Sequence, residues 1–563
     1  MPAVTATASQ TQLKPTLDMM YHWEKHSPGK TYLTQPIEGQ TLTWTWQEFG
    51  QEVRKMAAWL KAQGLEPGSR IGILSRNCAH WIMSDLAIMM SGHISVPIYP
   101  NVNAETIAYI LDHSDVKVLF VGKLEAHDWT EMKKGIPATV TCVSYGIYDL
   151  AETRFPTWAE ATASVAPMAE NPSRHLDETM TIIYTSGTTG VPKGVVLTFL
   201  NTAFAAEELV SLLFKLNEND RFFSYLPLSH IAERMLVLVG TMRCGGSIHF
   251  ARSLDTFAEN LRDCKPTVFL GVPRIWTKFQ SGVLAKFSPS RLSLLLSIPV
   301  IGGVIRKKIK EALGLDQARV CLTGAAPISA NLLTWFKRIG IDIYEVYGMT
   351  ENSAYSHSNL PGAARVGTVG RALSQAEVKI TSEGEICVKS LATMKEYYRE
   401  PEKTAEALRD GWLHTGDKGV MDADGFLTIT GRVKDMFKTS KAKYVAPNPI
   451  ELKLAKNEII EQVCVVGSGL PQPLALVVLS PDARKRSREE VAASLKTTLT
   501  EVNPTLEDHE KLQNIIVIQD EWTVENGVLT PSLKIKRGVV DDRFTRHYET
   551  WYAAGRQTVI WEK

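Results

Sequence analysis

From residue 70 the chain alternates short, continuously apolar runs with segments of helical length. The apolar runs are RIGILS (70–75), ISVPIY (94–99) and VKVLFVG (116–122), and the stretches between them extend to Met90 and His113. Apolar strands joined by helices are typical of a parallel sheet that is covered on both faces. The alternation returns at RFFSYLPLS, SIHFA, TVFLGV, ARVCLTGA and IDIYEVYG. The pattern therefore predicts an α/β protein with two doubly wound halves.

A β-rich subdomain is expected between about Gly367 and Gly431. Its short alternating runs, VKITSEGEICVKS and MDADGFLTIT, turn at Glu-Gly and Asp-Gly pairs, as antiparallel strands do. A basic stretch, RVKDMFKTSKAKYVAP, follows, and IEQVCVVGS, LALVVLS and NIIVIQD then predict a smaller α+β domain. We place the boundary near Lys434, with a large N-terminal domain over residues 1–432 and a C-terminal domain over 433–563.

The composition excludes several classes of protein. Of 563 residues, 44% are hydrophobic and 22% are charged, which is typical of a globular protein and not of a disordered or fibrous one. Lys and Arg number 62 against 61 Asp and Glu, so no overall charge favours nucleic acid as a partner. Seven cysteines without a C-x-x-C pair argue against a disulfide framework and a zinc site. With no secretory signal at MPAVTATASQTQLKPT, they indicate buried thiols in a cytoplasmic protein.

The longest apolar stretch runs from Leu292 to Ile305 and is followed at once by RKKIK. It is shorter than the roughly 20 residues that a membrane-spanning helix needs. A proline and two glycines are expected to prevent a helix here. Buried core or a lid segment is the simpler interpretation, and peripheral contact with an anionic membrane face is the alternative.

The segment Thr185–Gly194, TSGTTGVPKG, has the residue types that bind phosphate. Hydroxyl groups donate to phosphate oxygens, glycines let backbone N–H groups come close, and Lys193 supplies a positive charge. The spacing is not that of a Walker loop, because Pro192 precedes the lysine and VVLT predicts a second strand. We therefore expect a strand, a loop and a strand. A Ser/Thr/Gly-rich surface hairpin without a ligand is the alternative.

Three later positions carry polar side chains suited to a nucleotide. The run YGMTE (347–351) ends an apolar strand, at the edge where open α/β sheets bind ligands. Asp417, in HTGD, can accept both ribose hydroxyls, and Arg432, in ITGR, can pair with phosphate or ribose. Taken singly, a Thr-Glu pair also caps helices and an Asp before Gly also makes turns.

Six motifs in order resemble the adenylate-forming superfamily of acyl-CoA synthetases, luciferases and peptide-synthetase adenylation domains. They are YTSGTTGVPKG, GAAP (324–327), YGMTE, HTGD, ITGRVKD and LTPSLKIKR, and they cover nearly the whole chain. Within the superfamily, LPLSHIAER, GVPRIW, YYREPEKTAEALRDGWLHTGD and FKTSKAKYVAPNPIE are most similar to bacterial long-chain fatty acid CoA ligases.

The resemblance implies binding residues for ATP, Mg²⁺ and coenzyme A. They are Thr185, Ser186, Gly187, Thr188, Thr189, Gly190, Lys193, Gly324, Ala325, Ala326, Pro327, Tyr347, Gly348, Thr350, Glu351, Asp417, Arg432, Lys434, Lys441 and Lys443. The 185–193 loop would hold the β- and γ-phosphates and later the pyrophosphate, while GAAP and Tyr347 would border adenine. Thr350 would contact phosphate, and Glu351 would coordinate Mg²⁺ together with waters. Asp417 and Arg432 would bind the ribose.

The resemblance implies two catalytic residues. Lys534, in LKIKR, matches the lysine of the mobile C-terminal domain that bridges the acyl carboxylate and the α-phosphate. His230, in LPLSH, matches a position beside the acyl carboxylate, although a lone histidine at a strand end is as often structural. Lys434 occupies the hinge position, about which the C-terminal domain would rotate between the two half-reactions.

The chain departs from the family at two places where many members have glycine. Many members have a glycine pair after the hinge where this chain has Lys441, Ala442 and Lys443. Their loss is expected to restrict the loop, and the two lysines would instead meet the phosphates of coenzyme A. The glycine that usually precedes the catalytic lysine is Leu533 here, and a residue with a Cβ resists a positive φ.

The activity that the resemblance implies is the ATP-dependent joining of a long-chain fatty acid to coenzyme A through an acyl-AMP. A medium-chain or aromatic acid, a carrier-protein thiol as acceptor and a catalytically silent, nucleotide-responsive lipid-binding protein stay open as alternatives. The acyl site is expected among the apolar segments 230–246 and 268–275. Peripheral contact with the inner membrane face and pairing into a homodimer also stay open.

Overall fold

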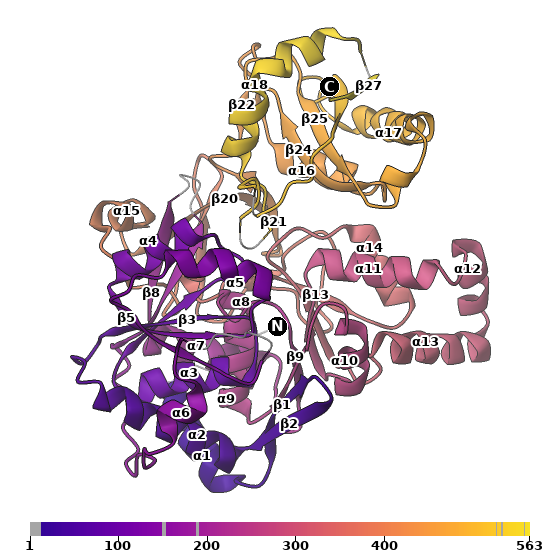
Figure 1. Ribbon diagram of the computed structural model, residues 1–563. Coiled ribbons are helices and arrows are strands. Elements are labelled where there is room, and N and C mark those ends of the chain that lie inside the picture. The colour runs from indigo at the N-terminus through magenta and orange to yellow at the C-terminus, as the bar shows by residue number, and fades with distance from the viewer. Residues whose placement is uncertain are drawn as a thin grey trace. The chain divides into compact units, whose positions relative to one another are not determined.

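The computed structural model describes residues 13–148, 154–186, 191–524, 526–530, 533–556 and 558–562. Contacts divide the chain into two compact units. The N-terminal unit comprises Met1–Ala326, Ala330–Glu377 and Val388–Leu413, and the C-terminal unit comprises Pro327–Ser329, Val378–Cys387 and His414–Lys563. Each unit is described by itself (Figure 1).

A seven-stranded sheet carries the first half of the N-terminal unit. Its strands, in spatial order, are β18 (Glu396–Tyr397), β8 (Pro192–Thr198), β7 (Thr179–Ser186), β4 (Ile94–Ile98), β3 (Arg70–Ser75), β5 (Val116–Gly122) and β6 (Thr141–Ser144). Strands β7, β4, β3, β5 and β6 are parallel neighbours, whereas β8 runs antiparallel to β7. The predicted parallel sheet and the predicted strand–loop–strand are both confirmed.

A nine-stranded sheet carries the second half. Its strands, in spatial order, are β15 (Arg371–Ala372), β14 (His357–Ser358), β13 (Ile343–Tyr347), β12 (Val320–Thr323), β11 (Val268–Leu270), β9 (Arg221–Ser224), β10 (Ser247–Phe250), β1 (Thr31–Ile37) and β2 (Gln40–Thr45). The five strands expected after the glycine-rich loop, β9 to β13, pair in parallel with one another. The antiparallel hairpin β1–β2 at the edge was not predicted.

Helices cover these sheets (Figure 1). They are α1 (Thr16–His26), α2 (Trp46–Ala62), α3 (Ala79–Met90), α4 (Ala104–Ser114), α5 (Ala126–Met132), α6 (Trp158–Thr162), α7 (Phe199–Ala206), α8 (Ile231–Glu233), α9 (Gly240–Cys244), α10 (Phe257–Cys264), α11 (Pro273–Leu284), α12 (Pro289–Ser297), α13 (Pro299–Leu313), α14 (Ala330–Arg338) and α15 (Pro401–Ala407). Every residue of α3 is buried, and α3 contacts strands of both sheets, β3 and β4 of one and β1 of the other. This helix explains why AHWIMSDLAIMM is apolar on all sides.

The β-rich region contributes to three sheets. Strand β15 extends the nine-stranded sheet by pairing with β14, which precedes the predicted region, and β18 extends the seven-stranded one. The remaining strands form a small antiparallel sheet of β16 (Glu377–Ile380), β17 (Glu385–Lys389), β20 (Trp412–Met421), β19 (Leu408–Arg409) and β21 (Leu427–Arg432). The hairpins predicted at Glu-Gly and Asp-Gly are β16–β17 and β20–β21, and the β-rich subdomain stays a prediction.

The C-terminal unit has its own sheet and core. The sheet consists of β24 (Ile460–Val466), β25 (Leu474–Leu479), β26 (Asn514–Ile518) and β27 (Thr558–Trp561), with α16 (Pro447–Leu454), α17 (Arg488–Val502) and α18 (Arg537–Ala553) packed against it. A short hairpin, β22 (Phe437–Lys438) and β23 (Tyr444–Val445), precedes them. The predicted α+β pattern is confirmed, and β27 is an additional strand.

The segment 292–305 differs from the expectation, because it forms most of α12 and the first two turns of α13. Pro299 lies in the first turn of α13, where a missing N–H removes no helical hydrogen bond. Gly302 lets the two helices pack closely, since a Cβ there would lie 2.6 Å from the Leu296 carbonyl oxygen. The prediction that the proline and the glycines prevent a helix here is therefore wrong. A buried core is also wrong for Leu294 and Val300, which are exposed.

All seven cysteines are buried and unpaired by disulfides, as predicted. Among the described residues, no helix is both long and apolar enough to cross a membrane.

Candidate active site

The glycine-rich loop connects β7 to β8 in an antiparallel hairpin. Thr185 pairs with Lys193 across the hairpin. Four of the predicted phosphate-binding residues, Gly187 to Gly190, lie outside the described residues, and so does the side chain of Ser186. The two described ends of the loop therefore place Thr185 and Lys193 side by side, as a shared phosphate ligand requires.

Lys193 and Glu351 are linked through Tyr397. The Lys193 Nζ lies 4.7 Å from the centroid of the Tyr397 ring, and the Tyr397 hydroxyl donates a hydrogen bond of 2.8 Å to Glu351 Oε1. Burial, together with the neighbouring Glu351 carboxylate, raises the pKa of Tyr397 well above its usual value, so the phenol stays protonated. The predicted phosphate-binding lysine and the predicted metal ligand are thus brought together.

No role was predicted for Tyr397, although it lies in the family phrase YYREPEKT. Strand β18 holds the tyrosine in place by pairing with β8, and the Tyr398 N–H donates to the Gly194 carbonyl at 2.7 Å. The Met394 N–H donates to the Glu351 carbonyl, also at 2.7 Å. One short strand therefore joins the phosphate hairpin to the segment that carries Glu351.

The ends of β12 and β13 bring GAAP and YGMTE together. These strands are parallel neighbours, with Thr323 opposite Glu345, so Gly324 and Ala325 emerge beside Tyr347 at the carboxyl edge of the sheet. That edge is where open α/β sheets bind nucleotides. Pro327 falls in the C-terminal unit, outside this group.

Both segments contain residues in the left-handed backbone conformation. Ala325 has a φ of 65°, and the consecutive Ser353 and Ala354 have φ values of 53° and 58°. Gly348 must be a glycine, because a Cβ there would lie 2.4 Å from the Ala354 carbonyl carbon. The loop holds Thr350 and Glu351 in a short 3₁₀ turn (η5, Thr350–Asn352) in which both are buried. Strain of this kind is typical of functional sites.

Asp417 and Arg432 are direct partners in the C-terminal unit. They lie opposite each other on β20 and β21, and Arg432 Nε donates to Asp417 Oδ1 at 3.0 Å. Asp417 is buried and the Arg432 side chain is 41% exposed. The two residues that the sequence assigned to ribose, fifteen positions apart, therefore form one carboxylate–guanidinium group.

Glu385, on the neighbouring strand β17, contacts two residues of the HTGD segment. Its Oε2 lies 2.8 Å from His414 Nδ1, and its Oε1 accepts a hydrogen bond of 3.1 Å from the Gly416 N–H. The buried Cys387 Sγ is 3.4 Å from the same His414 nitrogen. Within the described residues, this is the one group of three such side chains whose ligand atoms all lie within 4.8 Å of one another.

A carboxylate, a thiol and an imidazole are ligand types that zinc accepts. The spacing of the cysteines did not predict this group, because its members come from two strands rather than from one C-x-x-C segment. The hydrogen bond from the Gly416 N–H to Glu385 also holds strand β20 in place at the residue before Asp417.

Lys534 follows a tight turn. The Leu533 N–H donates to the Thr530 carbonyl at 2.8 Å, and the Thr530 N–H donates to the Lys534 carbonyl at 2.7 Å. The Thr530 hydroxyl oxygen accepts from the Lys534 N–H at 3.0 Å. Leu533 has a φ of 61°, so the turn adopts the conformation that glycine favours despite the Cβ. The Lys534 side chain is exposed.

The turn between β22 and β23 repeats this pattern. The Ala442 N–H donates to the Thr439 carbonyl at 3.0 Å, the Thr439 N–H donates to the Lys443 carbonyl at 2.8 Å, and Ala442 has a φ of 59°. Lys443 is exposed next to it, as is Lys441. Leu533 and Ala442, which replace glycines of the family, therefore both keep the left-handed backbone conformation. An exposed lysine follows each of them directly.

Replacing Leu533 with glycine is expected to stabilise the C-terminal unit by about 1 kcal/mol. A non-glycine residue in the left-handed region costs about 1–2 kcal/mol, and the greater freedom of glycine in the unfolded chain offsets part of the gain. Urea unfolding followed by a signal from the C-terminal unit measures the change. Leu533→Ala, which keeps the Cβ, is the control and should show no gain. A lower unfolding midpoint for the glycine variant would contradict the inference that the backbone is strained at Leu533.

His230 lies at the N-terminus of α8. Its Nδ1 accepts a hydrogen bond of 3.2 Å from the Ala232 N–H, which caps the helix and indicates the neutral tautomer with the proton on Nε2. Three residues on, Glu233 is fully buried and accepts from Ser224 Oγ at 2.9 Å and from the Tyr225 N–H at 3.0 Å. Burial raises the pKa of Glu233 to about 8. His230 thus has a structural role as the cap of α8. Its role beside the acyl carboxylate stays a prediction.

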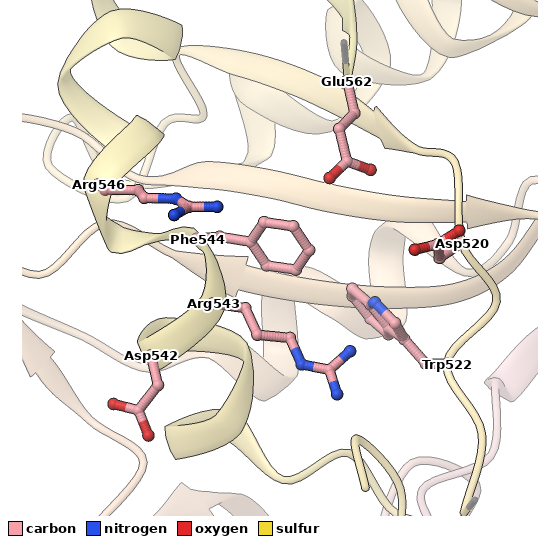
Figure 2. Close-up of a pocket in the computed structure, with 7 residues that line it drawn as sticks. All are labelled: Asp520, Trp522, Asp542, Arg543, Phe544, Arg546 and Glu562. Carbon is pink, nitrogen blue, oxygen red and sulfur yellow. The ribbon is translucent and has the colours of Figure 1, made fainter. Parts of the chain in front are cut away.

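A depression of about 300 Å³ lies on the C-terminal unit, and none of the predicted site residues lines it. Figure 2 shows its lining: Asp520, Trp522, Asp542, Arg543, Phe544, Arg546 and Glu562. Three carboxylates against two guanidinium groups leave it without an excess of positive charge, so it does not suit a nucleotide phosphate.

Comparison with known families decides the relationship. The family described as AMP-binding enzyme matches residues 20–398, and the AMP-binding enzyme C-terminal domain matches residues 434–556. The chain belongs to the AMP-binding enzyme family. The resemblance to adenylate-forming enzymes is confirmed, and so is the class of fold.

Curated relatives of this AMP-binding enzyme cover most of its length. A long-chain fatty acid CoA ligase of Mycobacterium bovis is 29% identical over 585 residues, which span 95% of this chain and 96% of that protein. Long-chain fatty acid CoA ligase 5 of Rattus norvegicus is 30% identical over 578 residues, spanning 88% of this chain and 82% of that protein.

Solved structures of the same fold are more distant in sequence. The anthranilate CoA ligase AuaEII in complex with anthranoyl-AMP superposes with a TM-score of 0.78 at 22% identity, covering 95% of this chain and 98% of that one. The A-PCP didomain of carboxylic acid reductase from Segniliparus rugosus, in complex with AMP, gives a TM-score of 0.80 at 22% identity, covering 97% and 83%. At this identity they support the fold of this AMP-binding enzyme and nothing finer.

Proposed function

We propose that this AMP-binding enzyme is a long-chain fatty acid CoA ligase. The carboxylate of the fatty acid attacks the α-phosphate of ATP, an acyl-AMP forms, and pyrophosphate leaves. The thiol of coenzyme A then attacks the acyl carbon, and AMP leaves. The observation that carries the proposal is the contact chain Lys193–Tyr397–Glu351, which joins a phosphate-binding cation to a metal-binding carboxylate. The curated relatives support the fatty acid and the acceptor.

The nucleotide would be divided among the groups described above. Thr185 and Lys193 would hold the β- and γ-phosphates, and Ala325 and Tyr347 would border adenine. Asp417, held by Arg432, would accept the ribose hydroxyls. Positive charge beside the α-phosphate is what the first step needs, because negative charge grows on its oxygens.

Glu351 suits Mg²⁺. It is buried, and among the ion pairs of the described residues none includes it. A buried carboxylate without a cation is costly, and oxygen ligands in a partly hydrated site are those that Mg²⁺ prefers. Thr350, next to it, adds a hydroxyl. When bound, the ion would neutralise charge on the phosphates, while Tyr397 keeps the carboxylate oriented by its hydrogen bond.

The acyl chain would lie against apolar side chains beside two π-helical segments, η3 (Glu207–Leu213) and η4 (Arg234–Val239). Such segments are rare and are frequent at functional sites. Five half-buried apolar side chains of one cluster line this region: Leu209, Leu213, Leu226, Leu236 and Val346. Val346 lies one residue before Tyr347, so the cluster reaches the strand edge proposed for the nucleotide. Part of the segment predicted from the sequence, 230–246, lies here.

A pyrophosphate-release screen with acids from acetate to oleate, with and without coenzyme A, tests the proposal. We expect release to be fastest with long-chain acids, and mass spectrometry should find acyl-CoA only when coenzyme A is present. Maximal release with aromatic acids would overturn the substrate class, and a product that stays an acyl-AMP would overturn the acceptor. No release with any acid would favour the lipid-binding alternative.

We further propose a cytoplasmic enzyme that works at the inner face of a membrane, because its substrate partitions into lipid. We also propose that the N-terminal domain ends at residue 432, that the C-terminal domain begins at residue 433, and that Lys434 is the hinge about which the C-terminal domain rotates.

A further inference from the structure

One helical hairpin, α12–α13, at the edge of the N-terminal unit carries a group of exposed apolar side chains (Figure 1). Of fifteen large hydrophobic side chains exposed among the described residues, five lie between positions 294 and 304. They are Leu294 (65% exposed), Ile298 (39%), Val300 (80%), Ile301 (44%) and Val304 (50%). Single exposed apolar residues are normal, but a contiguous group marks an interaction surface.

The same hairpin is strongly basic. Residues 289–313 contain five Lys or Arg and one acidic residue, although the whole chain has a formal net charge of only +1. The acidic residue is Glu311, whose Oε1 lies 3.9 Å from the Lys307 Nζ. Positive charge is therefore concentrated where the apolar side chains are exposed. This combination complements a surface that is apolar inside and negatively charged outside.

Exposed side chains change from apolar to basic along one stripe of α13. Val300, Ile301 and Val304 occupy its first turns, and Lys307 and Lys308 follow three to four residues after Val304, on the same face. From Val300 to Lys308 the helix rises about 12 Å, at about 1.5 Å per residue. If the N-terminal end of α13 enters the acyl region of a lipid layer, the two lysines reach the level of the headgroups.

The hairpin is held rigidly. The Arg306 Nη2 donates to the Leu296 carbonyl at 3.1 Å, and its Nε donates to the Arg338 carbonyl of α14 at 3.0 Å. Gly302 allows the close packing of α12 on α13. The exposed apolar group is thus built into the fold, and it does not depend on a chain end that folds back.

We propose that the α12–α13 tip docks on the surface of an anionic lipid bilayer. The apolar side chains of Ile298, Val300 and Ile301 would enter the acyl region, and Lys307 and Lys308 would pair with lipid phosphates. The usefulness of this contact rests on the proposed function, because a fatty acid dissolved in the bilayer would then be near its enzyme. The contact itself is measured without substrate.

Vesicle co-sedimentation of the full-length protein tests the proposal. We expect binding to vesicles of phosphatidylcholine with phosphatidylglycerol, weaker binding to phosphatidylcholine alone, and a loss of binding as salt is raised. Lys307→Ala/Lys308→Ala should weaken binding to the anionic vesicles by about fivefold per lysine. Val300→Ser/Ile301→Ser should reduce binding to both kinds of vesicle.

Matched controls come from exposed residues elsewhere. Leu254→Ser removes a side chain that is 82% exposed outside the hairpin, and Lys485→Ala removes an exposed lysine of the C-terminal unit; both should bind vesicles as the unaltered protein does. Equal binding by the hairpin variants, or no binding by the unaltered protein, would overturn the proposal. A dimer in sedimentation velocity that only the hairpin variants dissociate would overturn it in favour of a second copy of this chain.

Pyrophosphate release with a soluble medium-chain acid is measured in parallel. The rate of release should be the same in all hairpin variants as in the unaltered protein. An unchanged rate also shows that the variants fold. Its absence from the unaltered protein would contradict the proposed function while leaving the vesicle result unaffected.

Discussion

Alanine in place of Lys534 is expected to slow acyl-AMP formation by about 10²- to 10³-fold, the size of effect seen when one group that stabilises transition-state charge is removed. The first half-reaction brings a carboxylate to a triphosphate, so a cation that contacts both is worth most at that step. The Lys534 side chain is exposed, and its backbone N–H donates to the Thr530 hydroxyl oxygen at 3.0 Å. The exchange of labelled pyrophosphate into ATP, which depends on the fatty acid, measures this half-reaction.

The second half-reaction separates this role from general damage. With acyl-AMP supplied, Lys534→Ala should still form the thioester, since the activated acyl group no longer needs the bridge. Lys536→Ala is the matched control, two residues further on at the start of α18, and it should leave pyrophosphate exchange near that of the unaltered protein. Unchanged exchange in Lys534→Ala would show that another residue is the catalytic lysine.

Proline at position 434 is expected to give the opposite pattern. Lys434 lies in a tight turn after β21, in which the Asp435 N–H donates to the Arg432 carbonyl at 3.3 Å and the Val433 N–H to the Gly416 carbonyl at 2.8 Å. A hinge must change its φ and ψ, and proline fixes φ near −65°. Acyl-AMP formation should stay measurable, while thioester formation should fall by about 10²-fold, the effect expected when reacting groups are misplaced.

Lys434→Ala is the control for this experiment. It removes the side chain and leaves both backbone torsions free, so it should form the thioester at close to the normal rate if the position acts as a hinge. Rapid-quench measurement of acyl-AMP and acyl-CoA in one reaction gives both rates. An equal loss of the two half-reactions in Lys434→Pro would mean that the substitution damages the nucleotide site and not a rotation.

Much of the fold could be predicted because the strands differ so clearly from their surroundings. The runs IGIL (71–74) and VLFVG (118–122) are apolar throughout, and a strand buried on both faces needs this. Asp417 and Arg432 were recognised by motif, and their pairing follows from the β20–β21 hairpin, whose Asp-Gly turn is visible in the sequence. Local patterns with a local cause were therefore predicted correctly.

Tyr397 was missed for a physical reason. Its ring contacts Lys193, about two hundred positions earlier, and its hydroxyl contacts Glu351, so its role depends on a strand pairing that no local pattern reveals. The group of Glu385, Cys387 and His414 was missed for the same reason, because its members meet across two strands.

The helical hairpin α12–α13 shows the opposite error. Proline and glycine were given their average effect on a helix, but Pro299 begins a helix and Gly302 lies where another helix comes close. Leu533 and Ala442 show the same limit for turns: hydrogen bonds from Thr530 and Thr439 hold these residues in a conformation that their side chains disfavour.

Tyr397 has a further consequence for the resting enzyme. Its ring face lies against the Lys193 ammonium group, and its hydroxyl donates to the Glu351 carboxylate. One neutral side chain therefore contacts both a residue proposed for phosphate and a residue proposed for the metal ion. A change at Tyr397 would alter the surroundings of both residues at once.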